Sequence, residues 1–68
     1  MKYTLKIGDV FVDSVNTVIC VKGIEIHFDK DVKIPPEIMI ECSHKIPTSN
    51  DIITETLPLK NFIEAVMF

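Results

Sequence analysis

The feature that most constrains the fold is a change of hydrophobic period near the end of the chain. Upstream, apolar and polar residues alternate as they do in β-strands. In the last segment the apolar residues recur at i, i+3, i+4, i+7 and i+8, and these are Leu59, Phe62, Ile63, Val66 and Met67. This spacing places them on one stripe of an amphipathic helix. The stripe must be covered, either by the core of the same chain or by a second chain.

The length of 68 residues predicts a single domain over residues 1–68. A chain of this size buries only roughly 60% of the surface that its unfolded form exposes, and its core supplies no more than about 3–5 kcal/mol. Small domains compensate with disulfides, a structural metal or oligomerisation. Because 47% of the residues are hydrophobic, we expect part of the apolar surface to lie in an interface of a homo-oligomer.

The chain starts without an apolar stretch typical of a signal peptide, and charged or hydroxyl residues interrupt every later apolar run. These observations predict a cytoplasmic protein that does not cross a membrane. In that reducing compartment Cys20 and Cys42 are expected to remain thiols.

The charges argue against nucleic-acid binding. The sequence has seven lysines, no arginine and ten acidic residues, for a net charge of −3. Nucleic-acid interfaces need a basic face, and base recognition relies on the guanidinium group that this chain lacks. The use of lysine in place of arginine, with frequent isoleucine, indicates an AT-rich genome such as that of a low-GC bacterium or its phage.

Alternating or β-branched runs predict short strands at 3–7, 10–12, 17–21, 24–28 and 32–34, with the run 17–21 in the centre of a sheet. Turns are expected between them at Gly8-Asp9, at 13–16, at Lys22-Gly23 and at 29–31. Pro35-Pro36 then ends the ladder because proline lacks the backbone donor.

The segment 37–42 is ambiguous. Its alternation favours a strand, and a short helix that begins at Pro36 is the alternative. A polar connection is expected over 43–51, and a final short strand over 52–55. Thr56 is the predicted N-cap of the C-terminal helix, with Pro58 in the first turn.

This order predicts a mainly β fold of the α+β class. It consists of an antiparallel meander of five or six short strands, with a small SH3-like barrel as its closed form, and one C-terminal amphipathic helix over about residues 57–67. The segment Lys6-Ile7-Gly8-Asp9-Val10-Phe11-Val12 resembles the Gly-Asp turn that begins many SH3-like barrels. The resemblance covers only this segment and names no family.

Four residues carry metal-ligand chemistry: Cys20, His27, Cys42 and His44. Zinc sites pair their ligands closely, as in Cys-x-x-Cys, and only Cys42 and His44 are close in this sequence. The predicted register also turns His27 outward and Cys42 inward. We therefore expect no metal site and no cofactor, with buried structural thiols and surface histidines instead.

Catalysis is not expected either. A nucleophilic cysteine needs a base within hydrogen-bond reach. Cys42 and His44 share one side of an extended strand, but positions i and i+2 are about 6.6 Å apart along it. We expect no contact between them, and the sequence shows no other catalytic set, so the protein is not expected to be an enzyme.

By exclusion, the sequence favours a small protein-binding module that is homo-oligomeric and acts as an inhibitor or adaptor by covering a partner's surface. The composition would suit a protein encoded by a phage or another mobile element. The residues expected to mediate self-association are apolar: Met39, Phe62, Val66, Met67 and Phe68.

The alternative is an oligomeric binder of a small molecule or nucleotide, with pockets between subunits and with Tyr3 or Phe11 for stacking. An SH3-like nucleic-acid binder is a third interpretation. The lysines that are candidates for contact with an anion are Lys2, Lys6, Lys30 and Lys33.

Overall fold

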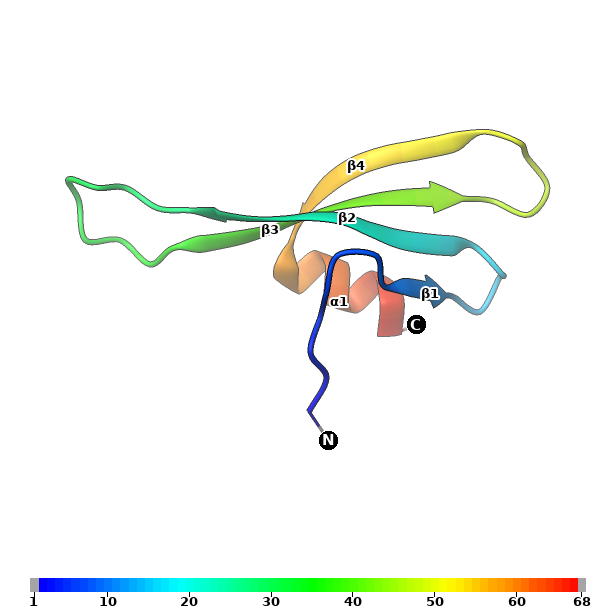
Figure 1. Ribbon diagram of the computed structural model, residues 1–68, viewed down its shortest axis with the longest axis horizontal. Helices are drawn as coiled ribbons and strands as arrows, with labels where there is room; N and C mark the ends of the chain where they lie inside the picture. The colour runs from blue at the N-terminus through cyan, green and yellow to red at the C-terminus, as the bar shows by residue number, and fades with distance from the viewer. Residues whose placement is uncertain (1, 68) are drawn as a thin grey trace.

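The computed structural model describes residues 2–67 and shows a mainly β protein (Figure 1). Its elements, in chain order, are β1 (Val10–Val12), β2 (Val18–His27), β3 (Glu37–Lys45), β4 (Ile52–Pro58) and α1 (Leu59–Met67). The strands pair in the order β1-β2-β3-β4, and each pair is antiparallel. The predicted meander and C-terminal helix are therefore confirmed. The described residues form four strands rather than five or six, and the sheet does not close into a barrel.

The segment 3–7, predicted as the first strand, is not a strand. It leads to a turn at Ile7 and Gly8, where Gly8 has a φ of 95° that favours glycine. The Gly8 amide donates to the Val21 carbonyl (2.8 Å), and the Val21 amide donates to the Asp9 carbonyl (2.9 Å). These two bonds fasten the turn to β2, and Leu5 of the preceding segment packs against the core.

The turn predicted at Lys22-Gly23 is also wrong, because β2 continues through it to His27. The register shifts there: Val21 pairs with Cys42, and Gly23 pairs with the next residue, Glu41. Lys22 is therefore the extra residue of a β-bulge. Since a bulge exchanges the two faces of a strand, Ile19 and Val21 before it, and Ile24 and Ile26 after it, all point to the same side.

The segment 37–42 is a strand, as its alternation favours, and β3 runs on to Lys45. The polar connection is consequently shorter than predicted and covers 46–51. The longest connection between strands lies instead at 28–36, at the tip of the β2–β3 hairpin. The Asp31 amide there donates to Asp29 Oδ1 (2.9 Å), which supports the predicted hairpin tip.

Helix α1 begins two residues later than predicted. Thr56 pairs with Glu41 and Pro58 pairs with Met39, so both belong to β4 and Thr56 does not cap the helix. Proline is tolerated at this place because β4 is an edge strand whose outer side needs no donor. The proline also favours an extended conformation at Leu57, which delays the helix until Leu59.

The core lies between α1 and one face of the sheet, here called the helix-side face. Five buried residues form it: Ile19, Val21, Ile40, Cys42 and Phe62. Phe62 is the contribution of α1, and its ring meets Phe11 edge to face at a centroid distance of 5.8 Å. The predicted helix thus covers the sheet of its own chain. No helix within residues 2–67 is long and apolar enough to cross a membrane.

Candidate functional site

The β2–β3 hairpin extends well beyond α1 as an arm, defined here as residues 24–38, and gives the molecule its elongated shape of 46 × 30 × 18 Å (Figure 1). Three isoleucines of the arm lie on the helix-side face, because Ile24 pairs with the core residue Ile40 and Ile26 pairs with Ile38. Their exposed fractions are 39% for Ile24, 60% for Ile26 and 37% for Ile38. The apolar face that forms the core therefore extends along the arm, where no other element within residues 2–67 covers it.

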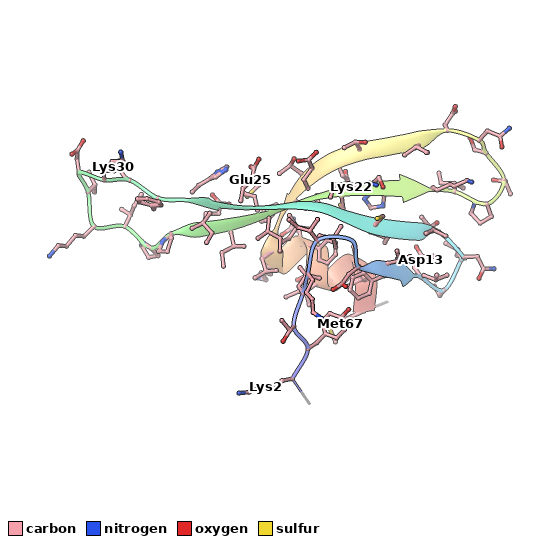
Figure 2. All side chains as sticks on the ribbon, in the orientation of Figure 1. Lys2, Asp13, Lys22, Glu25, Lys30 and Met67 are labelled. Atoms are coloured by element: carbon pink, nitrogen blue, oxygen red, sulfur yellow. The ribbon has the colours of Figure 1, made fainter. Side chains whose placement is uncertain are left out.

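The opposite face of the arm carries the polar residues of both strands. Glu25 and His27 from β2 lie there, with Nε2 of His27 3.0 Å from Oε2 of Glu25. Glu37 pairs with His27 and belongs to the same face. Figure 2 shows Glu25 on the side of the sheet away from α1. Within the paired strands of the arm, ionisable groups occur on one face only and the other face is uncharged.

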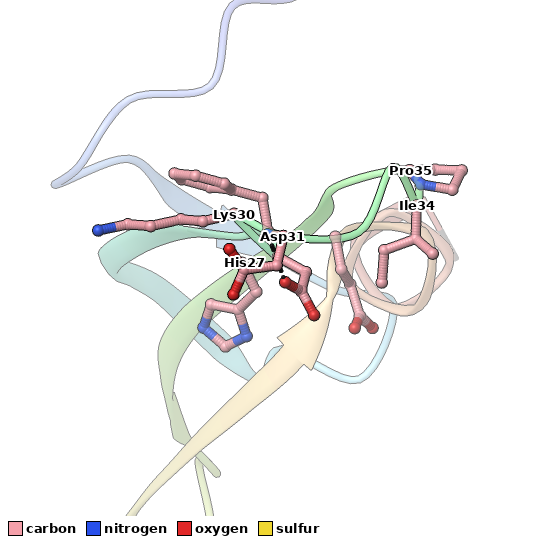
Figure 3. Close-up of a pocket in the computed structure, with 8 residues that line it drawn as sticks. His27, Lys30, Asp31, Ile34 and Pro35 are labelled. Atoms are coloured by element: carbon pink, nitrogen blue, oxygen red, sulfur yellow. Dashed lines mark hydrogen bonds between the residues drawn. The ribbon is translucent and has the colours of Figure 1, made fainter.

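The tip of the arm encloses a shallow hollow of about 600 Å³, shown in Figure 3. Three carboxylates border it, those of Asp29, Asp31 and Glu37, against a single lysine, Lys30. In Figure 3 the Lys30 side chain extends away from Asp31. The excess of carboxylates opposes the binding of an anion in this hollow.

The four lysines predicted for anion contact do not form one surface. Lys2 and Lys6 lie in the N-terminal segment, whereas Lys30 and Lys33 belong to the arm loop, and all four are exposed. Figure 2 shows Lys2 and Lys30 on different parts of the molecule. The structure therefore provides no concentrated basic patch within residues 2–67.

A second hollow of about 560 Å³ lies between the N-terminal segment, β1 and α1. Its lining is apolar apart from the Tyr3 hydroxyl, which donates to Asp9 Oδ2 at 3.1 Å. No lysine lines it. The lining residues are Tyr3, Leu5, Phe11, Leu59, Phe62, Ile63, Val66 and Met67.

The residues predicted for self-association are separated by the fold. Phe62 is 1% exposed and packs inside its own core, so it presents no surface to a second chain, a correction to the prediction. Val66 and Met67 border the second hollow, and Met67 is 71% exposed. Met39, paired with Glu25, lies on the face opposite α1 and is half-buried. Phe68 lies outside the described residues.

The four potential metal ligands also divide between two faces. Cys20 and His27 lie on the face opposite α1, and Cys42 and His44 lie on the helix-side face. The expectation that Cys42 and His44 would not touch was wrong: Sγ of Cys42 is 3.4 Å from Nε2 of His44. The spacing used for that expectation is the one between the Cα atoms of Cys42 and His44. The histidine side chain is long enough for its ring to reach the neighbouring thiol.

A third residue joins this pair from the neighbouring strand. Glu55 of β4 pairs with Cys42, and its Oε1 is 2.7 Å from Nε2 of His44. The donor atoms of Cys42, His44 and Glu55 all lie within 4.8 Å of one another. Cys42 is buried, whereas the side chains of His44 and Glu55 are 18% and 44% exposed. The cluster therefore has one ligand atom buried in the core, on Cys42, and two partly exposed side chains on its solvent side.

The cluster does not have the geometry of an activated nucleophile. In such a site the base contacts the nucleophile through one ring nitrogen while a third group orients the ring through the other. Here Nε2 contacts both the thiol and the carboxylate. In addition, burial raises the pKa of the Cys42 thiol, and the Glu55 carboxylate raises it further, whereas a reactive cysteine needs a lowered pKa.

Comparison with models of protein families, with curated proteins and with solved structures found no significant match. The functional argument therefore rests on the geometry of this chain.

Sequence reasoning missed four residues of these surfaces: Ile24, Ile26, Ile38 and Glu55. The alternation of Ile24 and Ile26 with charged residues was a clear signal of one apolar face. The sequence does not reveal whether the helix reaches far enough to cover this face. Glu55 offered no local signal, since its proximity to His44 depends on the pairing of β3 with β4.

Proposed function

We propose that the protein is a small protein-binding module whose working form is a homo-oligomer assembled through the apolar face of the arm. The observation that carries this proposal is the uncovered continuation of the core face over Ile24, Ile26 and Ile38. Helix α1 has nine residues and follows β4 at the base of the arm. At 1.5 Å per residue it is about 13.5 Å long and leaves these isoleucines exposed.

The occupant that suits this face is a second copy of the same chain. The face is uncharged because the ionisable groups of the two arm strands lie on the opposite side. A two-fold axis would bring identical apolar patches together, which requires no complementary charge from another protein. Ile24 is the cross-strand partner of Ile40, so such an interface would enlarge an existing core.

An inhibitor or adaptor that works by covering a partner's surface needs a rigid binding face and no reacting groups. The oligomer would leave accessible the part of α1 that borders the second hollow, including Met67 and Ile63, which are 71% and 42% exposed. This supports the protein-binding role expected from the sequence.

The test compares two aspartate variants at isoleucines of similar exposure. Ile26, in the arm, is 60% exposed, and Ile52, at the start of the edge strand β4, is 64% exposed. In light scattering, the wild-type protein should have a multiple of the monomer mass. I26D should weaken association at least about tenfold, about 1.4 kcal/mol, with an unchanged circular dichroism spectrum, and I52D should associate as the wild type does.

A monomeric wild-type protein would contradict the proposal. Dissociation by I52D with no effect of I26D would instead place the contact at the edge of β4, where an unpaired strand can pair with another chain.

A second candidate function is the binding of a small molecule, because the hollow beside α1 has about 560 Å³ and ligand sites commonly have roughly 300–1,000 Å³. The lining favours an apolar ligand over a nucleotide, since it offers no lysine for phosphate. A thermal-shift panel of fatty acids and nucleotides tests this function. A ligand at 100 times its dissociation constant should stabilise the fold by about 2.7 kcal/mol, and no response across the panel would exclude binding by these classes.

A further inference from the structure

The cluster of Cys42, His44 and Glu55 brings one sulfur, one nitrogen and one oxygen atom within 4.8 Å of one another. Nε2 of His44 lies 3.4 Å from Sγ of Cys42 and 2.7 Å from Oε1 of Glu55. This nitrogen carries either a proton, which it can donate to the carboxylate, or a lone pair, which can accept the thiol proton. When Nε2 is protonated, it donates to Glu55, and the Cys42 sulfur is only a weak second acceptor. A cation placed between the three atoms would be bound by the electron pairs of sulfur, nitrogen and oxygen together.

We propose that Cys42, His44 and Glu55 form a zinc site with three protein ligands and an open fourth position. Thiolate, imidazole and carboxylate are the usual ligands of Zn²⁺. Two of them come from alternate positions of β3 and the third from the residue of β4 that pairs with Cys42. The site would therefore clamp two neighbouring strands of a domain whose core is small, a recognised means of stabilising such chains.

The distances suit this ion. Zinc binds sulfur at about 2.3 Å, and nitrogen and oxygen at about 2.0–2.2 Å, so tetrahedral ligands lie about 3.4–3.6 Å apart. The 3.4 Å between Cys42 and His44 matches this spacing. The 2.7 Å between His44 and Glu55 is shorter. The half-exposed Glu55 side chain would need to move outwards by less than about 1 Å to reach the zinc spacing.

The surroundings of the cluster favour a bound cation. On the flanking strands the pairing partners of His44 are Ile19 and Ile53, so apolar side chains lie on both sides of the imidazole. Such surroundings strengthen the attraction between the ion and its anionic ligands. Binding would release the Cys42 proton to solvent, and the thiolate and the Glu55 carboxylate would balance the charge of Zn²⁺. The partly exposed side of the cluster leaves room for a water molecule as fourth ligand.

The experiment uses the reduced, metal-free full chain titrated with Co²⁺ and then with Zn²⁺. We expect one Co²⁺ per chain, a thiolate-to-cobalt charge-transfer band, the visible bands of a tetrahedral complex, and displacement of Co²⁺ by Zn²⁺. His44→Gln and Glu55→Gln should each weaken Zn²⁺ binding at least about tenfold. Cys42→Ser should abolish the charge-transfer band.

The matched controls are Cys20→Ser and His27→Gln, which alter the same residue types on the opposite face. Both should bind as the wild type does. Cys42 is fully buried, so if Cys42→Ser does not fold, the two variants at the partly exposed ligands decide the question. A Zn²⁺ dissociation constant above about 0.1 mM, or an equal loss in the controls, would overturn the proposal.

Discussion

The helix-side face of the sheet has two regions with almost the same residue types and opposite environments. At the base, Ile19 and Ile40 are 2% and 0% exposed beneath α1. In the arm, Ile24 and Ile26 on the same face are 39% and 60% exposed. Ile24 and Ile40 are direct cross-strand partners. Burial on this face therefore depends on the reach of one short helix rather than on the strand pattern, and this contrast makes the arm a candidate interface.

The largest effect is expected within α1, where Phe62 is 1% exposed and Met67 is 71% exposed. Phe62→Ala should cost about 3–5 kcal/mol, because it removes a ring packed on Phe11 and leaves a cavity. That is comparable to the whole stability of a small domain, so the variant should be largely unfolded by circular dichroism. Met67→Ala should leave the free energy of unfolding nearly unchanged. Equal losses of stability in the two variants would show that α1 does not pack on the sheet through Phe62.

The next prediction compares an isoleucine of the covered base with an isoleucine of the arm, both on the helix-side face. Ile40→Ala should destabilise the fold by about 2–5 kcal/mol, measured by urea denaturation. Ile26→Ala should be measured at a concentration low enough for the proposed oligomer to dissociate, so that only the single chain contributes. There it should change the free energy of unfolding by less than about 0.5 kcal/mol. A large loss for Ile26→Ala under these conditions would mean that the arm is covered within its own chain.

A smaller effect is expected at Gly8, in the turn that fastens the N-terminal segment over the covered region. Its φ of 95° is unfavourable for a residue with a Cβ, although no atom lies within 4 Å of the position that a Cβ would occupy. Gly8→Ala should therefore cost about 1–2 kcal/mol through backbone strain alone. Thermal denaturation with calorimetry measures this loss. An unchanged midpoint would show that the turn relaxes to another conformation.

The smallest effect is expected at Gly23, where the bulge marks the boundary between the two regions. A Cβ there would lie 3.2 Å from Oε2 of Glu41, the mobile end of a half-buried side chain that can move aside. Gly23→Ala should change the stability by less than about 1 kcal/mol, with reduced freedom of the unfolded chain partly offsetting the close contact. A loss larger than that of Gly8→Ala would indicate that the bulge itself requires glycine.

Several elements could be predicted from the sequence because their signals are local. The apolar stripe of Leu59 to Met67 predicted α1, and alternation predicted that 37–42 is a strand. Lys22-Gly23 was misinterpreted, because a glycine beside a lysine suits a turn and a bulge equally well. Only the pairing of Val21 with Cys42 and of Gly23 with Glu41 distinguishes them.

The cluster proposed as a metal site likewise depends on strand pairing, which the sequence does not reveal. Cys42 and His44 were visible as a close pair in the sequence, but Glu55 enters the cluster only through the pairing of β3 with β4. Separation along the chain says nothing about which strand supplies the third side chain of the cluster. Similarly, the sequence identified Phe62 as part of an apolar stripe, but not that its own sheet covers it.

By itself, the sequence determined the type of most secondary-structure elements, the antiparallel order of a meander, and which residues share a face within a run of strand that no bulge interrupts. These properties follow from spacing along the chain, since side-chain direction repeats with a fixed period in strands and helices. The tertiary structure alone decided which apolar face is covered and that the side chains of Cys42, His44 and Glu55 meet. Both depend on the relative lengths of β2, β3 and α1 and on strand register, which arise only when the elements pack together.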